Sequence, residues 1–530
     1  MNRYYVVEGN KRVSVLKYFK ADSIVANVTR KIPKYSEDED VKLYYEYMKF
    51  NQISGLNNIE FSKIGMVDKL LALMGSTAIW DADTRMEFNS LVNHFTKAYE
   101  FRGGRKLPIR VGDALTAFIN VYGYNTVLGM SDDELSLNIV KCWNEFVMLT
   151  EKQSVGLVMD PLAAEERKGR NIFSYFMPSS AKKFTVAFLY PKSPDTSDWI
   201  YAHDLGRNYL EETFPDQMKT ICVNDVTEER TEQVLNDVIR QGADIIFEVA
   251  PQMMKDSLKV AVDHPDVKIL NCSLNTSHKY IRTYYARMYE AKFLSGMIAG
   301  ALAENDRIAY IADYPIYGMI ANINAFALGA SFTNPRARIY LAWSTSENYD
   351  RERFLKDNNI QVVSDQDMIT PRDPGRQFGL YECSEDGRKL NLVMPLWNWG
   401  VFYEKMIQSI LAGSYQSEEN SEGRALNYWW GMSAGVIDLI CSKNVPTGVK
   451  RLVDHLKSDI KKGDIVPFYG EIRAQDGTLK NKKDKAMKPE AIMEMDWLTD
   501  NVIGEIPTMG ELRAEARPVV QIKGVEEKMK

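Results

Sequence analysis

The chain has 530 residues, of which 45% are hydrophobic and 26% are charged. This length exceeds what one ordinary hydrophobic core accommodates, so we expect two to four domains. A net charge of −6 argues against a general surface for nucleic acid or anionic membrane, so we expect a small or neutral partner and no nucleic acid.

The beginning of the chain and its cysteines bear on compartment and cofactors. The five cysteines lie far apart and form no C-x-x-C or metal-ligand pattern. We therefore expect reduced thiols, with neither a metal nor a cofactor. The first residues, MNRYYVVEGNKRVSVLKYF, contain no apolar stretch of signal-peptide length and no lipid-accepting cysteine follows them. As written, the sequence predicts a cytoplasmic protein.

Residues 1–35 are typical of a strand, a turn, a helix and a second strand, which cannot bury a core alone. The stretch VVEGNKRVSVLK resembles the ParB and sulfiredoxin-like fold, in which a Gly-x-x-Arg turn holds a nucleotide phosphate. The resemblance assigns phosphate binding to Gly9, Lys11 and Arg12. The alternative is a plain turn with two solvated bases. The strands that should precede the motif are missing, so we expect Met1 to lie inside a longer protein.

A helical domain is predicted over residues 36–180. Two segments open with capping-box spacing, Ser36 to Glu39 and Ser131 to Glu134, and continue with apolar residues three and four apart. The stretch EERKGRNIFSYFMPSSAKK is typical of a linker into the next domain. Such amphipathic helices usually pack among themselves. The alternative is that they mediate dimerisation or contact a partner, which the sequence does not identify.

From residue 184 short β-prone runs alternate with helical segments, which predicts an α/β fold built from βαβ units. Nine strands are predicted, and they suit two doubly wound parallel-sheet lobes better than one sheet. They are FTVAFLY, MKTICVN, ADIIFEVA, VKILNCS, RIAYIAD, ARIYLAW, IQVVSDQD, QFGLYEC and LNLVMPLW. Ligands of parallel sheets bind beyond the carboxyl ends of the strands, so two lobes facing each other predict a cleft that closes by a hinge.

Several ordered blocks carry a family resemblance. They are DWIYAHDLGR, QGADIIFEVAPQMMKDSLKVAVDHPDVKIL, YYARMYEAKFLSGMIAG, YPIYGMIANINAFALGASFTNP, MPLWNWGVFYEK, YWWGMSAGVIDL, PFYGEIRAQDG and MEMDWLTDNVIGEIP. These blocks, over residues 184–507, resemble the basic membrane protein family of ABC-importer substrate-binding proteins, similar to purine-nucleoside receptor lipoproteins. The resemblance implies the type I periplasmic-binding-protein fold, a nucleoside-like ligand and the membrane subunits of an ABC transporter as partners. Relatives in this family are exported or membrane-anchored.

The same resemblance implies domain boundaries. Lobe 1 is expected at about 184–290 and lobe 2 at about 305–395, with a crossing back after 395. Residues 508–530 are expected to be a C-terminal tail.

Trp199 is the first candidate ligand-binding residue. Nucleoside receptors of the family place an aromatic residue just after the first strand, and a base stacked on such a ring gains about 1 to 3 kcal/mol. The family also places an acid before the ring and an Asn after it. Asp195 or Asp198 offers the acid, whereas Ile200 stands in place of the Asn. The alternative interpretation of Trp199 is a helix-start ring packed against the sheet.

Polar residues near the ends of other predicted strands are further candidates. Glu248 and Asn271 end strands of lobe 1 and are candidates to bind ribose hydroxyls or base edges; strand-end capping or an ion pair is the alternative. Tyr349, Asp367 and Glu382 occupy comparable places in lobe 2, Tyr349 as a second stacking ring.

The block PLWNWG departs from the nucleoside receptors, which often carry a Ser and a ligand-contacting Lys there. This chain has Trp397 and Asn398 instead, so it loses a cation and gains aromatic surface. We expect Arg287, Tyr289 and Glu290 to be mainly structural, with Arg287 and Glu290 at the crossover between the lobes, and ligand contact as the alternative. Gly296 and Gly300 are expected to allow close helix packing. His203 is expected to be a packed helix residue, with a role as a base as the alternative.

No catalytic motif is found: G-x-S-x-G, a Walker loop and H-E-x-x-H are all missing, and the five histidines are scattered. The sequence therefore predicts a solute-binding protein, not an enzyme, whose cleft closes on a nucleoside-like molecule. The alternative is a cytosolic sensor that couples this domain to the N-terminal module. A nucleoside-cleaving enzyme would need a metal-binding Asp cluster, and the acids here lie singly on different strands.

Overall fold

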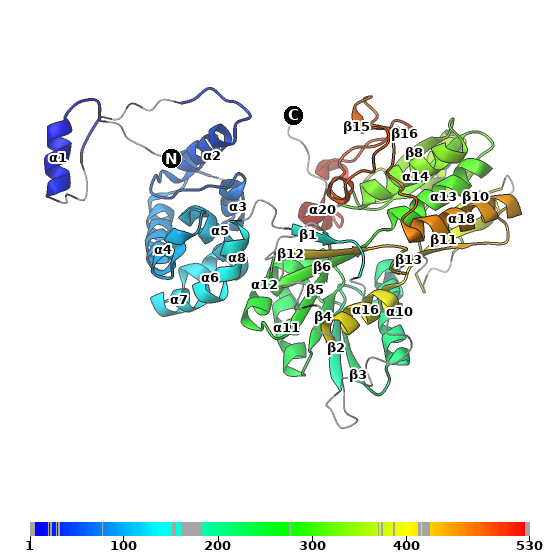
Figure 1. Ribbon diagram of the computed structural model, residues 1–530, viewed down its shortest axis with the longest axis horizontal. Coiled ribbons are helices and arrows are strands. Elements are labelled where there is room, and N and C mark those ends of the chain that lie inside the picture. Colours follow the sequence, from blue (N-terminus) through cyan, green and yellow to red (C-terminus); the bar gives the residue numbers. More distant parts are fainter. Residues whose placement is uncertain are drawn as a thin grey trace. The chain divides into compact units, whose positions relative to one another are not determined.

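The computed structural model describes residues 6–19, 21, 24–27, 29, 32–76, 78–150, 155–161, 183–274, 278–368, 370–372, 375–384, 387–411, 415 and 425–524. The chain divides into two compact units, Met1–Lys152 and Gln153–Lys530 (Figure 1). None of the helices in these described ranges is long and apolar enough to span a bilayer.

The first unit is helical around an aromatic core. Its helices are α1 (Asn10–Tyr18), α2 (Glu39–Ser54), α3 (Met66–Leu73), α4 (Ala82–Phe101), α5 (Val111–Tyr122), α6 (Tyr124–Leu128), α7 (Asp132–Lys141) and α8 (Trp143–Met148). The side chains of Phe50, Phe88, Phe95, Phe118 and Phe146 are fully buried and pack among buried aliphatic side chains. Because aromatic rings bury large areas, a unit of this size can hold a core without a sheet.

One of the two predicted capping boxes is confirmed. Ser131 accepts a hydrogen bond from the Glu134 N–H at 3.3 Å, and the Glu134 carboxylate accepts one from the Ser131 N–H at 2.9 Å. The box at Ser36 is wrong, because α2 begins at Glu39 and Asp38 caps it by accepting from the Asp40 N–H at 2.9 Å. An Asp caps as well as a Ser, and this one lies closer to the apolar run.

The N-terminal segment contains α1 but not the predicted strands. Residues 6–9 and 24–27, which are the described parts of those expected strands, have no strand structure. A strand needs a neighbour for its backbone groups, and this stretch offers none that the structure describes. Gly9 precedes α1 with a φ of 86°, and Lys11 and Arg12 are exposed on the helix. Phosphate binding by these three residues stays a prediction.

The helical unit ends earlier than predicted. Its last helix stops at Met148, and the boundary between the units follows Lys152 rather than residue 180. Strand β1 (Val155–Val158) already belongs to the second unit, where it pairs with β12 (Ala425–Trp430) in parallel. The run VGLV, three apolar residues and one Gly, has no helical period, which is why it joins a sheet. The linker expected after it falls mostly outside the described residues.

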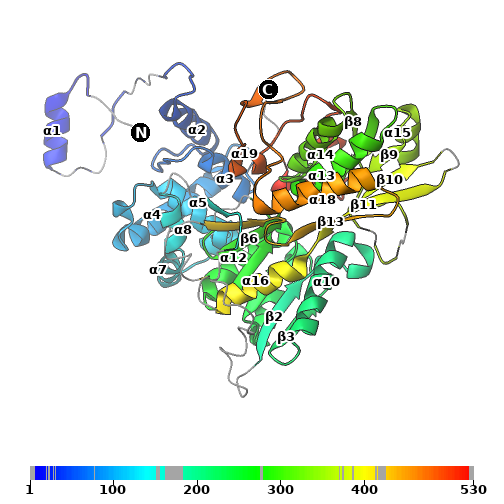
Figure 2. The same ribbon diagram turned by 45° about the vertical axis from the view of Figure 1, so that its right-hand side comes forward.

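Lobe 1 of the second unit is a parallel sheet of order β1-β12-β6-β5-β4-β2-β3. Its other strands are β2 (Phe184–Leu189), β3 (Met218–Val223), β4 (Ile245–Glu248), β5 (Lys268–Cys272) and β6 (Ile281–Ala286). Helix α10 (Asp198–Thr213) packs beside α16 (Trp399–Leu411), and α11 (Thr231–Arg240) packs beside α12 (Met254–Asp263) (Figures 1 and 2). Short turns of 3-10 helix precede three of these helices, at Pro194–Thr196, Glu228–Arg230 and Pro251–Met253.

Lobe 2 has a sheet of order β13-β11-β10-β9-β7-β8-β16. Its strands are β7 (Arg307–Ala312), β8 (Arg338–Trp343), β9 (Val362–Ser364), β10 (Leu380–Cys383), β11 (Lys389–Trp397), β13 (Ile437–Cys441) and β16 (Val502–Ile503). The predicted α/β class with two lobes is confirmed, but β10, β11 and β13 run antiparallel to their neighbours. Only five residues separate β10 from β11 in the chain, and a parallel pair would need a long crossover there.

The helices of lobe 2 include one tightly packed pair, α13 (Tyr289–Leu302) and α14 (Met319–Thr333). A methyl group at Gly296 would overlap the Phe326 carbonyl oxygen, and one at Gly300 would overlap that of Ala330. The prediction that these glycines allow close helix packing is therefore confirmed. Helix α18 (Thr447–Lys462) lies beside α13 (Figure 2), and α15 (Arg351–Asp357) lies between β8 and β9 in the chain.

The chain passes between the lobes three times, after β6, after β11 and after β12. The end of the chain is not a free tail as far as the structure describes it. The turn Met509–Glu511 and helix α20 (Arg517–Lys523) pack back onto the lobes, and Leu512, Ala516 and Val520 are buried there. Apolar residues spaced in this way form a helix face that packs on another surface. The prediction of a tail did not take this spacing into account.

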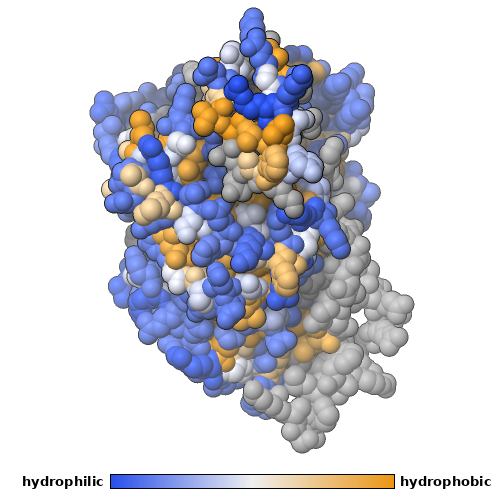
Figure 3. Space-filling model, turned by 90° about the vertical axis from the view of Figure 1, so that its left-hand side faces the viewer, coloured by the Kyte–Doolittle hydropathy of each residue, from blue (hydrophilic) through white to orange (hydrophobic). Residues whose placement is uncertain are grey.

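The remaining elements are small. Two short strands, β14 (Ile472–Arg473) and β15 (Leu479–Asn481), form a hairpin, and α19 (Pro489–Met493) follows. On the face of the molecule drawn in Figure 3, hydrophobic patches are interspersed with hydrophilic surface.

Candidate ligand-binding site

A cavity of about 640 Å³ lies between the two lobes. It is lined by residues that follow strand ends: Asp198 and Trp199 after β2, Pro251 after β4, Asp313 after β7 and Asp367 after β9. This is the position predicted for a ligand of facing α/β sheets. The volume lies within the usual range for small-molecule sites, roughly 300 to 1,000 Å³.

Aromatic rings form one wall of the cavity. Trp199 lines it, half-buried, and its indole N–H donates to the Val249 carbonyl oxygen at 2.8 Å. The Trp199 ring stacks on Tyr285 at a centroid distance of 5.8 Å and meets Trp397 edge-on at 5.2 Å. Both of the latter rings also line the cavity. Trp199 therefore packs against its neighbours and also faces the cavity. Both interpretations that the sequence left open, a packed ring and a cavity ring, thus apply to it.

A second aromatic layer lies behind this wall. His203 is fully buried, stacks on Trp399 at 4.3 Å and has its Nδ1 at 2.5 Å from the Tyr403 hydroxyl. Burial holds the pKa of His203 well below its ordinary value, so this side chain is neutral. Its predicted role as a packed helix residue is confirmed, and it joins α10 to α16.

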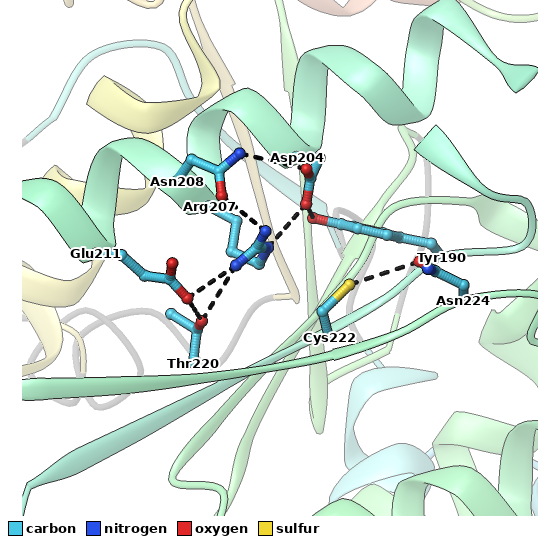
Figure 4. A network of polar contacts seen from close by, with 8 residues as sticks. All are labelled: Tyr190, Asp204, Arg207, Asn208, Glu211, Thr220, Cys222 and Asn224. Carbon is cyan, nitrogen blue, oxygen red and sulfur yellow. Dashed lines mark hydrogen bonds and ion pairs between the residues drawn. The ribbon is translucent and has the colours of Figure 1, made fainter. Parts of the chain in front are cut away.

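Helix α10 is also tied to the edge of the sheet by a polar network (Figure 4). The Arg207 guanidinium donates to Asp204 at 2.7 Å and to Glu211 at 2.8 Å, and the Thr220 hydroxyl on β3 donates to the same Glu211 carboxylate. The Tyr190 hydroxyl donates to Asp204 at 3.3 Å. These bonds fix the helix whose first turn carries Asp198 and Trp199.

Among the described residues, five carboxylates line the cavity: Asp198, Asp313, Asp365, Asp367 and Glu515. Asp198 accepts from the Trp199 N–H at 2.8 Å, and burial, with the nearby charges of Asp313 and Asp367, raises its pKa to about 6. Asp313 accepts from the Ser344 hydroxyl, and burial raises its pKa as well. Asp195, the other acid considered from the sequence, does not line the cavity and lies near Arg372 at 3.8 Å.

Lys292 is the main cavity residue that the sequence analysis missed. It lies on α13 with 4% of its surface exposed, donates to Asp367 at 2.5 Å and lies 5.3 Å from the centre of the Tyr310 ring. Burial opposes its charge, but the Asp367 carboxylate together with Tyr310 and Asp365 raises the pKa of Lys292. The cavity therefore contains a buried cation that does not come from the PLWNWG block. A lysine within an otherwise apolar helix was the signal that could have found it.

Glu248 and Asn271 lie behind the cavity wall, not in it. Both are fully buried, and the Asn271 amide donates to Glu248 at 2.8 Å and to the Ala250 carbonyl oxygen at 3.0 Å. The Ser257 hydroxyl also donates to Glu248, whose pKa burial raises to about 7. These residues support the loop that does line the cavity, so the strand-end interpretation holds for them.

Three further predicted residues lie away from the cavity. Tyr349 packs on the small apolar cluster of Leu355 and Tyr381, beside Arg351. Glu382 lies within β10, between β9 and β11, so the sheet separates it from the cleft. Asn398 donates to the Gly435 carbonyl oxygen at 3.1 Å in a connection between the lobes. Their position near strand ends in sequence did not predict the direction of each side chain.

Arg287 and Glu290 join the connections between the lobes, in agreement with their expected structural role. The Arg287 Nε donates to Glu290 at 2.7 Å, and the second Glu290 oxygen accepts from the Met432 N–H at 2.7 Å. Arg287 also donates to the Met159 carbonyl oxygen at 2.7 Å. This buried pair therefore links α13 to the segment after β12 and to the segment after β1.

Two lobes joined by three crossings, with an aromatic and acidic cavity between them, have the architecture of the type I periplasmic-binding-protein fold. Residues 183–371 match the sequence model of the Bmp family, described as ABC transporter substrate-binding protein PnrA-like. This part of the chain is thus similar to ABC transporter substrate-binding proteins.

Curated relatives align with this part of the chain. A purine-binding protein of Brucella abortus is 27% identical over 339 residues, which cover 62% of this chain and 95% of that protein. A putative ABC transporter glucose-binding protein of Haloferax volcanii is 24% identical over 344 residues, which cover 62% of this chain and 83% of that protein. A solved solute-binding protein of an ABC transporter system from Conexibacter woesei is 14% identical, with a TM-score of 0.40, over 53% of this chain and 98% of that chain.

Proposed function

We propose that the cavity binds a nucleoside-like small molecule. The observation that carries this proposal is the placing of Trp199, Tyr285 and Trp397 around one cavity with the carboxylates of Asp198 and Asp313. A flat base can stack on the rings, and carboxylates accept hydrogen bonds from ribose hydroxyls and base amino groups. The name of the Brucella relative, a purine-binding protein, supports the same class of ligand.

The charges of the cavity favour a neutral ligand over an anionic one. Among the described residues, five carboxylates line it against three cations, Lys192, Lys292 and Arg513, and Lys292 is already paired with Asp367. A phosphate placed here would meet unpaired carboxylates, and like charges brought together in a cleft cost several kcal/mol. We therefore expect nucleosides and nucleobases to bind more tightly than nucleotides.

Thermal-shift and calorimetric titrations test this proposal. The panel is adenosine, guanosine, uridine, adenine, adenosine monophosphate and glucose, the last because the Haloferax relative is named as glucose-binding. A ligand at 100 times its Kd adds about 2.7 kcal/mol to stability. If glucose binds and no nucleoside or nucleobase does, the proposed ligand class is wrong.

The variant Trp199→Ala tests the stacking wall. We expect it to weaken nucleoside binding by about 1 to 3 kcal/mol. Trp497→Ala is the matched control, because this ring is half-buried, packs near Lys480 at 5.5 Å and does not line the cavity. Equal losses in the two variants would mean that Trp199 acts only through folding.

The second candidate function is a cytosolic sensor or regulator that couples the binding domain to the N-terminal part of the chain. The helical unit supports it, because α2 to α8 precede the segment that matches the family. A transport component must act outside the membrane with the ABC membrane subunits, whereas a sensor acts in the cytoplasm. Cell fractionation separates the two, and a purely cell-surface location would dismiss the sensor.

A further inference from the structure

The C-terminal segment, residues 508–524, reaches the ligand cavity. Arg513, Glu515, Ala516 and Val519 are among the residues that line it, although they follow the last sheet strand of either lobe. The cavity therefore has a wall that belongs to neither sheet.

This segment is anchored on lobe 2 by polar contacts. The Glu347 N–H donates to the Glu511 carbonyl oxygen at 3.0 Å, and the Arg513 N–H donates to that of Thr345 at 2.9 Å. The Arg517 guanidinium lies 3.0 Å from the Glu347 carboxylate and also donates to the Leu512 carbonyl oxygen at 2.9 Å. Two backbone bonds and an ion pair on one loop fix the direction in which the segment enters the cleft.

Apolar packing adds to this anchor. Leu512 and Ala516 are fully buried and Val520 nearly so, and the three pack with Tyr314 and Ile316 of lobe 2. Burial of these apolar side chains stabilises the contact with lobe 2. The segment is therefore held as part of the domain.

The segment also contacts lobe 1, although the two lie far apart in the sequence. Helix α20 packs against the turn Pro251–Met253, in which Pro251 and Gln252 line the cavity. On the lobe 2 side, the anchoring loop is the one whose Ser344 hydroxyl donates to Asp313. The segment thus touches both lobes next to cavity residues of each.

We propose that residues 509–524 form a ligand-contacting wall of the binding site and help determine its specificity. The ligand part of this proposal rests on the proposed function of the cleft. Since the anchor is on lobe 2 and the contact with lobe 1 is smaller, the wall moves with lobe 2 and leaves Pro251–Met253 when the cleft opens. It places Arg513 and Glu515 at the cavity.

Deletion of residues 509–530 in the otherwise complete chain tests the wall. In the ligand-free protein, we expect faster hydrogen exchange over residues 249–254, which lose the cover of α20. With adenosine as the probe, followed by tryptophan fluorescence, we expect the dissociation rate to rise about tenfold, since contacts of this kind act mainly on dissociation. Arg473→Ala, which removes an exposed ion pair to Glu471 at 2.7 Å outside the cavity, is the control and should change neither quantity.

Two milder variants keep the test valid if the deletion does not fold. Arg517→Ala loosens the anchor and should move exchange and dissociation in the same direction by a smaller factor. The double variant Arg513→Ala/Glu515→Ala keeps the anchor and should change the ratio of adenosine to guanosine affinity at least threefold while leaving exchange at 249–254 unchanged. Unchanged exchange and dissociation in Arg517→Ala, or an unchanged affinity ratio in the double variant, would overturn the proposal. The exchange measurement needs no ligand, so a failure of adenosine to bind the wild type would count against the proposed function alone.

Discussion

The ammonium of Lys292 lies 2.5 Å from one carboxylate oxygen of Asp367, and the other oxygen accepts the indole N–H of Trp397 at 3.1 Å. One carboxylate thus joins α13, the loop after β9 and the end of β11 beside the ligand cavity. Because the ammonium and the carboxylate are both largely buried, each depends on the other for its charge.

Lys292→Met should destabilise the α/β unit strongly. It leaves the Asp367 carboxylate buried without a cation, which typically costs about 3 to 5 kcal/mol. Urea denaturation measures the loss, and Lys292→Met/Asp367→Asn should recover part of it. Lys450→Ala is the control: it removes an ion pair to Asp454 at 3.0 Å whose side chains are about half exposed, which contributes about 1 kcal/mol or less. Similar losses for Lys292→Met and Lys450→Ala would contradict the argument.

Gly296→Ala should destabilise the same unit by about 2 kcal/mol or more. The added methyl group would meet the Phe326 carbonyl oxygen and force α13 away from α14, and overpacking of this kind costs about 1 to 3 kcal/mol. Gly448→Ala is the matched control, because it also lies in a helix but has no heavy atom within 4 Å of the added carbon. The control should be neutral or slightly stabilising, since Ala favours helix over Gly. The free energies of unfolding decide between the two outcomes.

Glu248→Gln should change how stability depends on pH. Burial raises the pKa of Glu248 to about 7 from an ordinary value of 4.5, so the folded state holds its proton longer than the unfolded state. The stability that the protonated form contributes is complete below pH 4.5 and is lost as the pH rises through 7. We therefore expect the variant to gain roughly 2 to 3 kcal/mol relative to wild type between pH 5 and 8. The exposed Glu228→Gln should show no such trend, and parallel curves for wild type and Glu248→Gln would refute the assignment.

Nine of the strands and the edge of the sheets that carries the cavity could be predicted, because β-prone runs alternating with helices have few arrangements. Trp199 could be placed in the cavity for the same reason, since it follows the first strand of a βαβ unit. Strands β6 and β12, which are neighbours in the lobe 1 sheet, and β13 were not predicted. The sequence alone could not show that the side chain of Glu248 lies outside the cavity. Side chains alternate between faces along a strand, and the one at 248 points to Ser257 on α12 while the loop just after it reaches the cavity.

The residues that were missed come from elements distant in sequence. Lys292 belongs to a helix that crosses from one lobe to the other, and Arg513 to a segment after the last strand. Lys292 and its partner Asp367 lie 75 positions apart in the chain, and no local period encodes such a contact. The antiparallel strands β10 and β11 were predicted as strands but not in direction, because direction follows from the length of the connection and not from composition.

Asp198→Asn should remove a pH dependence of ligand binding. The pKa of Asp198 is raised to about 6, first by burial and then by Asp313 and Asp367, so the carboxylate exists above that pH and takes up a proton below it. A ligand hydroxyl or amino group that donates to the carboxylate loses its acceptor on protonation, so wild-type affinity should fall as the pH decreases from 7.5 to 5. The variant should bind more weakly at pH 7.5 by about 1 to 3 kcal/mol, the range for a hydrogen bond to a charged group, and should vary less with pH.

The control for this experiment is Asp195→Asn, three residues earlier in the chain. Its carboxylate is exposed and lies outside the cavity, so affinity and its pH profile should match the wild type. Calorimetric titration of adenosine at four pH values separates the two acids. A pH profile that became flat in Asp195→Asn but not in Asp198→Asn would contradict this assignment. The ligand would then contact the outer side of this turn, because a ligand stacked on Trp199 inside the cavity would lie next to the Asp198 carboxylate.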